Sequence, residues 1–267
     1  MASSASITDR KFLTLLLACA ALGISSAHAV AQISSSNGDK AQRVPVLVEL
    51  FTSEGCSDCP PADALLADLD AKQYVPGAEA IVLSEHVTYW NHLGWRDPFS
   101  LDAMTQRQED YVRRFALDSA YTPQAVVDGA IEFVGSDGRA MSAAVSKAAA
   151  KPKANLVIEN TRWDHGSVRF AVRGEVPIGA KLIAVVAANA THSEVARGEN
   201  AGRTLHHTAV VRALKEMDGA VADGRPLSLE AIKTQLRGSA DTELRLVVFA
   251  TDRSTGRVIA AAEQTLR

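Results

Sequence analysis

The residues of this sequence that are most suited to chemistry are two cysteines with two residues between them, Cys56 and Cys59. At this spacing the sulfurs can meet in a short disulfide when the second cysteine lies near the start of a helix. The unsatisfied amides of a helix N-terminus favour a thiolate, and thiol pKa values in such motifs can fall from about 8.5 to about 7 or lower. The spacing predicts thiol–disulfide chemistry, with Cys56 as the catalytic nucleophile and Cys59 as the resolving catalytic thiol.

Other interpretations of the pair stay open. One is a binding module in which the two cysteines form an inert structural disulfide. Another is a periplasmic copper-handling protein that holds Cu(I) through the reduced pair. His86, at the end of a predicted strand, could complete such a Cys2His site or exchange protons with a thiol, although hydrogen bonding to the backbone at the strand end is the simpler role. A zinc site is disfavoured because no second cysteine pair supplies four ligands.

Two acidic residues, Glu54 and Asp58, flank the cysteines. Negative charge disfavours a neighbouring thiolate, so we expect a raised thiol pKa. This expectation favours a couple near the reducing end of the known range, around −270 mV. The alternative is that both carboxylates point to solvent and have little effect.

The elements that must position the pair can be read from the hydrophobic pattern. A β-branched run at residues 44–51 predicts a buried strand, and Pro60 and Pro61 predict the start of a helix because proline is tolerated in a first helical turn. Further along, an Asp-Gly pair at residues 128–129 between two apolar runs predicts a hairpin. The predicted order is strand, helix, strand, helix, strand, strand, helix, with the later elements at residues 80–86, 101–117, 124–127, 130–134 and 138–151.

This order resembles the thioredoxin fold, because Thr122-Pro123 precedes the hairpin and follows the cysteine motif at a matching place. In that fold a cis proline faces the dithiol and holds the backbone of the substrate. The resemblance therefore implies that Pro123 binds substrate, and that Thr122 lies beside the sulfurs and takes part in that binding.

Five segments resemble, more closely, a bacterial secreted thioredoxin-like family that is known only as a domain of unknown function. They are EGCSDCPPAD at 54–63, HVTYWN at 86–91, GWRDPF at 94–99, YTPQ at 121–124 and RGENAGR at 197–203. The resemblance implies a fold and a compartment but supplies no substrate. The motif departs from that of ordinary thioredoxins because its prolines follow the second cysteine.

The pattern changes after Lys151-Pro152-Lys153, which we interpret as a linker. Strands are predicted at residues 155–162, 167–173, 181–188, 204–214, 243–251 and 257–264, with a helix or loop near 228–236. Such spacing is typical of an antiparallel sandwich. The predicted fold class is therefore an α/β thioredoxin-like domain at 44–152, followed by an all-β sandwich-like domain at 153–267. Within the latter, His206 and His207 should point to opposite faces of one strand.

The N-terminus has the features of an export signal. Arg10 and Lys11 precede an apolar run at residues 12–24, and Ala27-His28-Ala29 supplies a cleavage site. The run falls short of the roughly 18–20 residues that a membrane span needs. We expect a signal peptide at 1–29, a flexible lead-in at 30–43 and a periplasmic or secreted protein; a lipoprotein attached through Cys19 is the alternative.

Composition limits the partners. The 28 basic and 31 acidic residues give a formal charge of −3, which excludes a strongly basic nucleic-acid binder, and no later segment suggests a stable membrane span. The 3 cysteines are too few for a disulfide-rich scaffold. Cleavage would leave only Cys56 and Cys59. The expected partners are protein thiols or disulfides and a periplasmic electron donor; no cofactor and no firm metal site are predicted.

Overall fold

The computed structural model describes residues 43–164, 167–217, 227–233 and 243–266. The predicted signal peptide, the alternative lipid attachment at Cys19 and nearly all of the predicted lead-in lie outside the described residues. No helix within the described residues is long and apolar enough to cross a membrane.

The first half of the described chain follows the predicted order of elements. Strand β1 is buried on both faces, and α1 begins at Pro60 as the proline pair predicts. The elements are β1 (Val44–Thr52), α1 (Pro60–Lys72), β2 (Ala78–His86), α2 (Asp102–Phe115), β3 (Gln124–Val127), β4 (Ile131–Val134) and α3 (Gly138–Ala149).

The hairpin between β3 and β4 turns at the expected pair. Asp128 and Gly129 both have positive φ angles, 52° and 60°. Two consecutive positive values are what a tight hairpin turn with the right-handed twist of its strands requires, and glycine adopts them without steric cost. The Asp-Gly signal is therefore confirmed.

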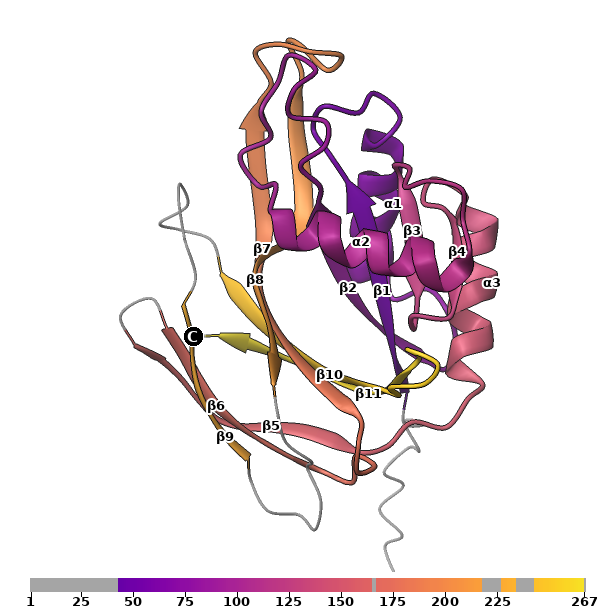
Figure 1. Cartoon of the computed structure of the whole chain (residues 1–267), viewed down its shortest axis with the longest axis vertical. Helices are drawn as coiled ribbons and strands as arrows, with labels where there is room; N and C mark the ends of the chain where they lie inside the picture. The colour runs from indigo at the N-terminus through magenta and orange to yellow at the C-terminus, as the bar shows by residue number, and fades with distance from the viewer. Residues whose placement is uncertain (1–42, 165–166, 218–226, 234–242, 267) are drawn as a thin grey trace, which may run out of the picture. The chain divides into compact units, whose positions relative to one another are not determined.

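The predicted fold class is wrong, because the chain does not build an α/β thioredoxin-like domain followed by a separate all-β domain. It forms a mostly-β fold with an eight-stranded mixed sheet and, among the described residues, three helices. The strand order in this sheet is β11-β10-β7-β8-β2-β1-β3-β4, so strands from both halves share one sheet (Figure 1). The junction is a parallel pairing of β2 with β8 at Ser84 and Val210. Such pairing satisfies backbone groups that a free strand edge would leave open.

The second half contributes most of its strands to this sheet and three to another. Strands β7 (Lys181–Glu194), β8 (Thr204–Met217), β10 (Leu244–Thr251) and β11 (Val258–Leu266) extend the large sheet. Strands β5 (Leu156–Asp164), β6 (Ser167–Gly174) and β9 (Leu227–Lys233) form a three-stranded sheet, and side chains of β5 and β6 share a hydrophobic core with β7, β10 and β11. The helix or loop expected near 228–236 is wrong over 227–233, because pairing with β6 makes that segment a strand.

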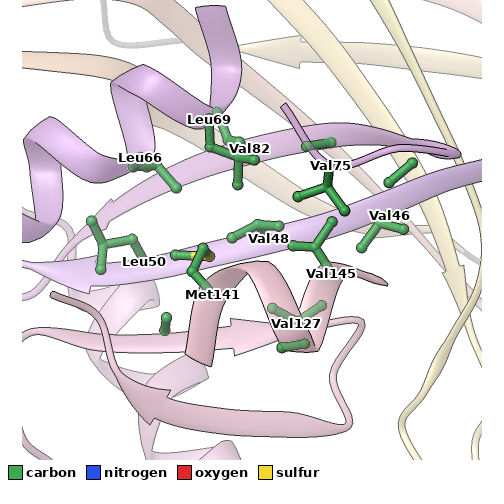
Figure 2. Close-up of a cluster of buried hydrophobic side chains, with 14 of the residues drawn as sticks. Val46, Val48, Leu50, Leu66, Leu69, Val75, Val82, Val127, Met141 and Val145 are labelled. Carbon is green, nitrogen blue, oxygen red and sulfur yellow. The ribbon is translucent and has the colours of Figure 1, made fainter. Parts of the chain in front are cut away.

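Helices cover the large sheet on both faces around β1. Figure 2 shows the core on one face, where α1 and α3 pack on β1, β2 and β3 through Val48, Leu66 and Met141 among others. On the other face, Met104 of α2 packs against Leu47 and Leu83. Alternate side chains of β1 therefore enter two different cores, which explains its continuous apolar run.

The division expected near residue 152 stays a prediction. Residues 40–267 cluster as one compact unit, and the large sheet crosses the expected boundary. What the fold establishes for the cysteine motif is its position: the motif joins the end of β1 to the start of α1, beside the β7–β8 hairpin (Figure 1).

Candidate functional site

The cysteine motif forms a tight turn that leads into α1. The amide of Cys56 donates to the Ser53 carbonyl oxygen at 3.1 Å, and the amide of Cys59 donates to the Cys56 carbonyl oxygen at 3.3 Å. Cys59 is the N-cap residue of α1, and both cysteines are buried and in the free thiol form. Ser57 and Asp58 between them are exposed, so the turn presents its outer side to solvent.

The pKa values of the two thiols are shifted in opposite directions. A hydrogen bond from the Cys59 side chain lowers the pKa of Cys56 to about 7, with help from Thr122 and the amides of Asp58 and Cys59 and against the effect of burial. Burial raises the pKa of Cys59, and the neighbouring Cys56 and the charge of Asp63 raise it further. At neutral pH a substantial fraction of Cys56 is therefore thiolate, beside a protonated Cys59 thiol.

Of the two residues predicted to bind substrate, Thr122 lies beside Cys56. The Thr122–Pro123 peptide bond is cis, and the Cys56 sulfur lies 3.8 Å from the Thr122 carbonyl oxygen. The indole nitrogen of Trp90 donates to the Thr122 hydroxyl group at 2.8 Å. The structure thus brings Cys56, Thr122 and Trp90 together, although they come from segments far apart in the sequence.

An aromatic residue of the segment at 86–91, Tyr89, also lies close to the dithiol. Burial raises the pKa of Tyr89 to about 12, and the charges of Cys59 and Cys56 contribute in the same direction. Tyr89 therefore stays neutral beside the pair at neutral pH.

His86 pairs with a side chain from the segment at 94–99. Its Nδ1 atom lies 2.7 Å from Asp97 Oδ2, so its partner is a buried carboxylate and not the backbone. Burial works to raise the pKa of Asp97, but His86 and the amides of Glu54 and Phe99 outweigh it and lower that pKa. In the described part of the chain no group of three or more His, Cys, Asp or Glu side chains is arranged to hold a metal ion, so Cys56, Cys59 and His86 do not form a preassembled site.

A second buried histidine, which the sequence did not single out for chemistry, connects the cysteine loop to β8. His207 Nε2 lies 3.2 Å from Glu54 Oε1, and His207 Nδ1 lies 3.6 Å from Asp63 Oδ2. Burial alone would lower the pKa of His207, but Asp63 and Glu54 raise it to about 10. Its ring also packs edge-on against His86, with centroids 4.6 Å apart. His206 is exposed, so the two adjacent histidines do point to opposite faces.

The loop between β7 and β8 holds the cysteine turn in place. Asn200 is buried and donates from its amide nitrogen to the carbonyl oxygens of both Glu54 and Cys56 at 2.9 Å. Glu199 accepts a hydrogen bond from the Ser57 amide at 3.0 Å. These residues were quoted only as part of a resembling segment, and no local signal in the sequence could place them against residues 54–57.

The expected effect of the flanking carboxylates is wrong for Cys56, whose pKa falls instead of rising. The carboxylate of Glu54 is compensated by its own partners, because Trp95 and Ser193 donate hydrogen bonds to it and His207 lies beside it. Asp58 is exposed, and its backbone amide stabilises the Cys56 thiolate. Hydrogen bonding within the turn outweighs the effect of local charge.

Comparison with known proteins places the chain in a family. A family model described as "Protein of unknown function (DUF1223)" matches residues 47–251, which include the dithiol, the cis proline, the Asn200 loop and His207. The chain belongs to the DUF1223 family. The five segments quoted above as a signature are not tested by this match, and the description of the DUF1223 family names no activity.

A crystal structure of an Agrobacterium tumefaciens protein, a structural genomics target, resembles this DUF1223 chain with a TM-score of 0.60 and 24% sequence identity. The likeness covers 84% of this chain and 95% of that one, and it shows a shared fold. A β-glucuronidase from Ruminococcus gnavus has a TM-score of 0.21 with 10% identity over 42% of this chain and 15% of that chain, which is too low to support an argument. No curated protein matches the chain.

These findings correct two further expectations. A thioredoxin-like fold does not describe this mostly-β DUF1223 chain, in which three helices of the described residues accompany an eight-stranded mixed sheet. The comparisons also supply no evidence of a signal peptide or of a redox centre.

Proposed function

We propose that this DUF1223 protein carries out thiol–disulfide exchange through Cys56 and Cys59. The proposal rests on the opposite pKa shifts of two neighbouring thiols. The pKa of Cys56 falls to about 7, while that of Cys59 rises. The thiolate is the reactive form in disulfide exchange, and a nucleophile with a pKa near ambient pH is close to the optimum. A purely structural pair gains nothing from this difference.

The reaction has two steps in the direction that reduces a partner. The Cys56 thiolate attacks one sulfur of a partner disulfide, forms a mixed disulfide and releases the other sulfur as a thiolate. The Cys59 thiol then loses its proton and attacks the Cys56 sulfur, which breaks the mixed disulfide and releases the second partner thiol. The two cysteines end as a disulfide, oxidised by two electrons, and the partner disulfide is reduced by the same two. Run backwards, the same steps oxidise a dithiol partner.

The surroundings of Cys56 support binding of a polypeptide beside the sulfur. Thr122 lies next to it, and Trp90 fixes the Thr122 hydroxyl group. We assign Thr122 and Pro123 to the binding of the partner, which would be a protein thiol or disulfide. An electron donor of the periplasm would then restore the working state, provided that the chain is exported by cleavage after Ala29, because disulfides persist in that oxidising compartment.

Single-cysteine variants test the proposal. With glutathione disulfide, Cys59→Ser should accumulate one glutathione per chain on Cys56, because the second step is blocked. Cys56→Ser should stay unmodified at neutral pH, because the raised pKa of Cys59 leaves it protonated. The wild-type protein should pass to an intramolecular disulfide that dithiothreitol reduces, all read by intact mass. An inert structural disulfide would resist dithiothreitol, and that result would overturn the proposal.

A further inference from the structure

A carboxylate lies one helical turn after the resolving cysteine with part of its hydrogen-bonding capacity unused. Asp63 follows Cys59 by four residues on α1, so the two side chains share a helix face. Asp63 is 5% exposed, and its Oδ1 atom is buried without a partner. A buried carboxylate oxygen without a hydrogen bond is costly, so its retention calls for an explanation.

The other oxygen of this carboxylate faces a cation that comes from the second half of the chain. His207 of β8 lies with Nδ1 at 3.6 Å from Asp63 Oδ2 and with Nε2 at 3.2 Å from Glu54 Oε1. A titratable neighbour that packs against its ring is His86, at a centroid distance of 4.6 Å, which itself pairs with Asp97. The imidazole therefore bridges two buried carboxylates, one from the cysteine loop and one from α1.

The second step of the proposed exchange needs a base that removes the proton of Cys59. Cys59 attacks the mixed disulfide only as a thiolate, and burial keeps its proton in place. Solvent hydroxide reaches a buried thiol slowly at neutral pH, so the step needs a base within the protein. The unpartnered oxygen of Asp63, on the same helix face, is suited to take that proton.

We propose that Asp63 is the proton acceptor for Cys59 and that His207 is a positioning residue that holds the Asp63 carboxylate in place and balances its charge. This inference rests on the proposed function. As Cys59 attacks Cys56, its proton passes to Asp63, the bond between Cys56 and the partner sulfur breaks, and the electron pair leaves with the partner sulfur. Asp63 then returns the proton to the departing thiolate or to water, so that no external acid, base or oxidant is consumed.

The direct test uses Asp63→Asn, which keeps the size of the side chain and removes its basicity. The matched control is Asp68→Asn, which removes an exposed carboxylate from the same helix. Reduced proteins are mixed with glutathione disulfide and quenched with acid at intervals, and intact mass then separates reduced, mixed-disulfide and intramolecular-disulfide forms. Asp63→Asn should slow resolution of the mixed disulfide by about a hundredfold while Cys56 still reacts in the first step, so that the mixed disulfide accumulates. The control should behave as the wild type.

The pH dependence separates a proton acceptor from a structural role. As the pH rises, solvent hydroxide replaces the missing base, so the deficit of Asp63→Asn should shrink steadily toward pH 10. A deficit that is independent of pH, or a resolution rate equal to that of the wild type, would overturn the assignment of Asp63. If the wild-type protein forms no mixed disulfide or never resolves one, the proposed function itself fails, and that outcome is visible before any Asp63 variant is compared.

The role of His207 is tested with His207→Gln against His206→Gln, the exposed neighbour on the same strand. His207→Gln can still hydrogen-bond but carries no charge. We expect it to shift the pH profile of the resolution step away from that of the wild type, while the first step and the His206→Gln profile stay unchanged. If folded His207→Gln protein shows the same pH profile of the resolution step as the wild type, His207 has no positioning role. Circular dichroism establishes folding, and if His207→Gln is unfolded, His207→Asn serves with the same two readouts.

Discussion

At the scale of single residues, Cys56 and Cys59 differ in acidity although only two residues separate them. The difference arises because one thiol donates a hydrogen bond and the other accepts it, and because Cys59 lies deeper at the start of α1. The carboxylates near the motif act on other groups: Glu54 binds Trp95 and lies beside His207. The pKa of Cys56 is therefore set by hydrogen bonds inside the turn more than by the neighbouring carboxylates.

The acidity of Cys56 can be measured through its rate of alkylation. The reaction of the reduced protein with iodoacetamide should rise with pH along a curve with its midpoint near 7. In Cys59→Ala the thiolate loses the hydrogen bond that lowers its pKa most, so the midpoint should move upward by about one unit. Ser57→Ala, at an exposed position in the same turn, should leave the midpoint unchanged. A midpoint that Cys59→Ala does not move would show that another group activates Cys56.

His207 should also leave a signature in the stability of the fold. Its pKa is about 10 in the folded chain and about 6.5 in an unfolded one, so it stabilises the fold fully below pH 6.5 and loses this contribution as the pH rises to 10. Urea unfolding of the wild type and of His207→Gln should show this as a difference in unfolding free energy that narrows between pH 6.5 and 10. A difference that stays constant over this range would mean that His207 is not protonated in the folded chain.

At the scale of elements, the loop between β7 and β8 stabilises the turn that carries the cysteines. Asn200 satisfies the carbonyl oxygens of Glu54 and Cys56, both of which belong to the turn. Close approach of this loop to the segment at residues 94–95 requires a small residue: a Cβ at Gly198, where φ is +78°, would lie 3.1 Å from the Trp95 Cβ. Segments from three parts of the chain thus meet around the dithiol.

Replacing Asn200 should weaken the fold. Asn200→Ala removes the amide that donates to two buried carbonyl oxygens and leaves the Cys56 carbonyl oxygen with only the Cys59 amide, which should lower the free energy of unfolding by about 1–3 kcal/mol. Arg197→Ala, at an exposed position of the same loop, should change it little. Urea denaturation of both variants measures the effect. Equal stability of the two variants would show that Asn200 does not hold the turn.

Local signals in the sequence predicted many elements and part of the site. Pro60 and Pro61 marked the start of α1, Asp128-Gly129 marked a hairpin, and the spacing of Cys56 and Cys59 predicted a second cysteine near a helix start, because each depends on neighbours in the chain. The strand β9 was missed because its pairing with β6 decides its structure. His207 was missed because its partners, Glu54 and Asp63, lie more than 140 residues away in the sequence.

At the scale of the whole molecule, pairing of β2 with β8 joins strands from both halves of the chain into one sheet. The sequence predicted two separate folds because alternation and helix periodicity report on each strand but not on its neighbours. The same junction brings β8 beside the cysteine loop, which is how His207 reaches Glu54.

A fragment of residues 43–152 tests whether the halves depend on each other. The fragment would expose the edge of β2 and leave Glu54 and Asp63 buried without His207, so we expect it to aggregate or remain largely unfolded. Circular dichroism and urea denaturation of the fragment, compared with the same measurements on the full chain, test this expectation. Cooperative unfolding of the fragment at the midpoint of the full chain would show instead an independent domain that ends near residue 152.

The central claim, that Cys56 and Cys59 form a reversible dithiol–disulfide couple, is tested most directly by the reduction potential of the pair. The protein is equilibrated with glutathione buffers of graded ratio, its thiols are trapped with an alkylating reagent, and the oxidised fraction is read by intact mass. We predict one two-electron transition with a midpoint between about −270 and −120 mV, because the stabilised Cys56 thiolate favours the reduced form. A pair that stays fully reduced or fully oxidised across the whole series would contradict the claim.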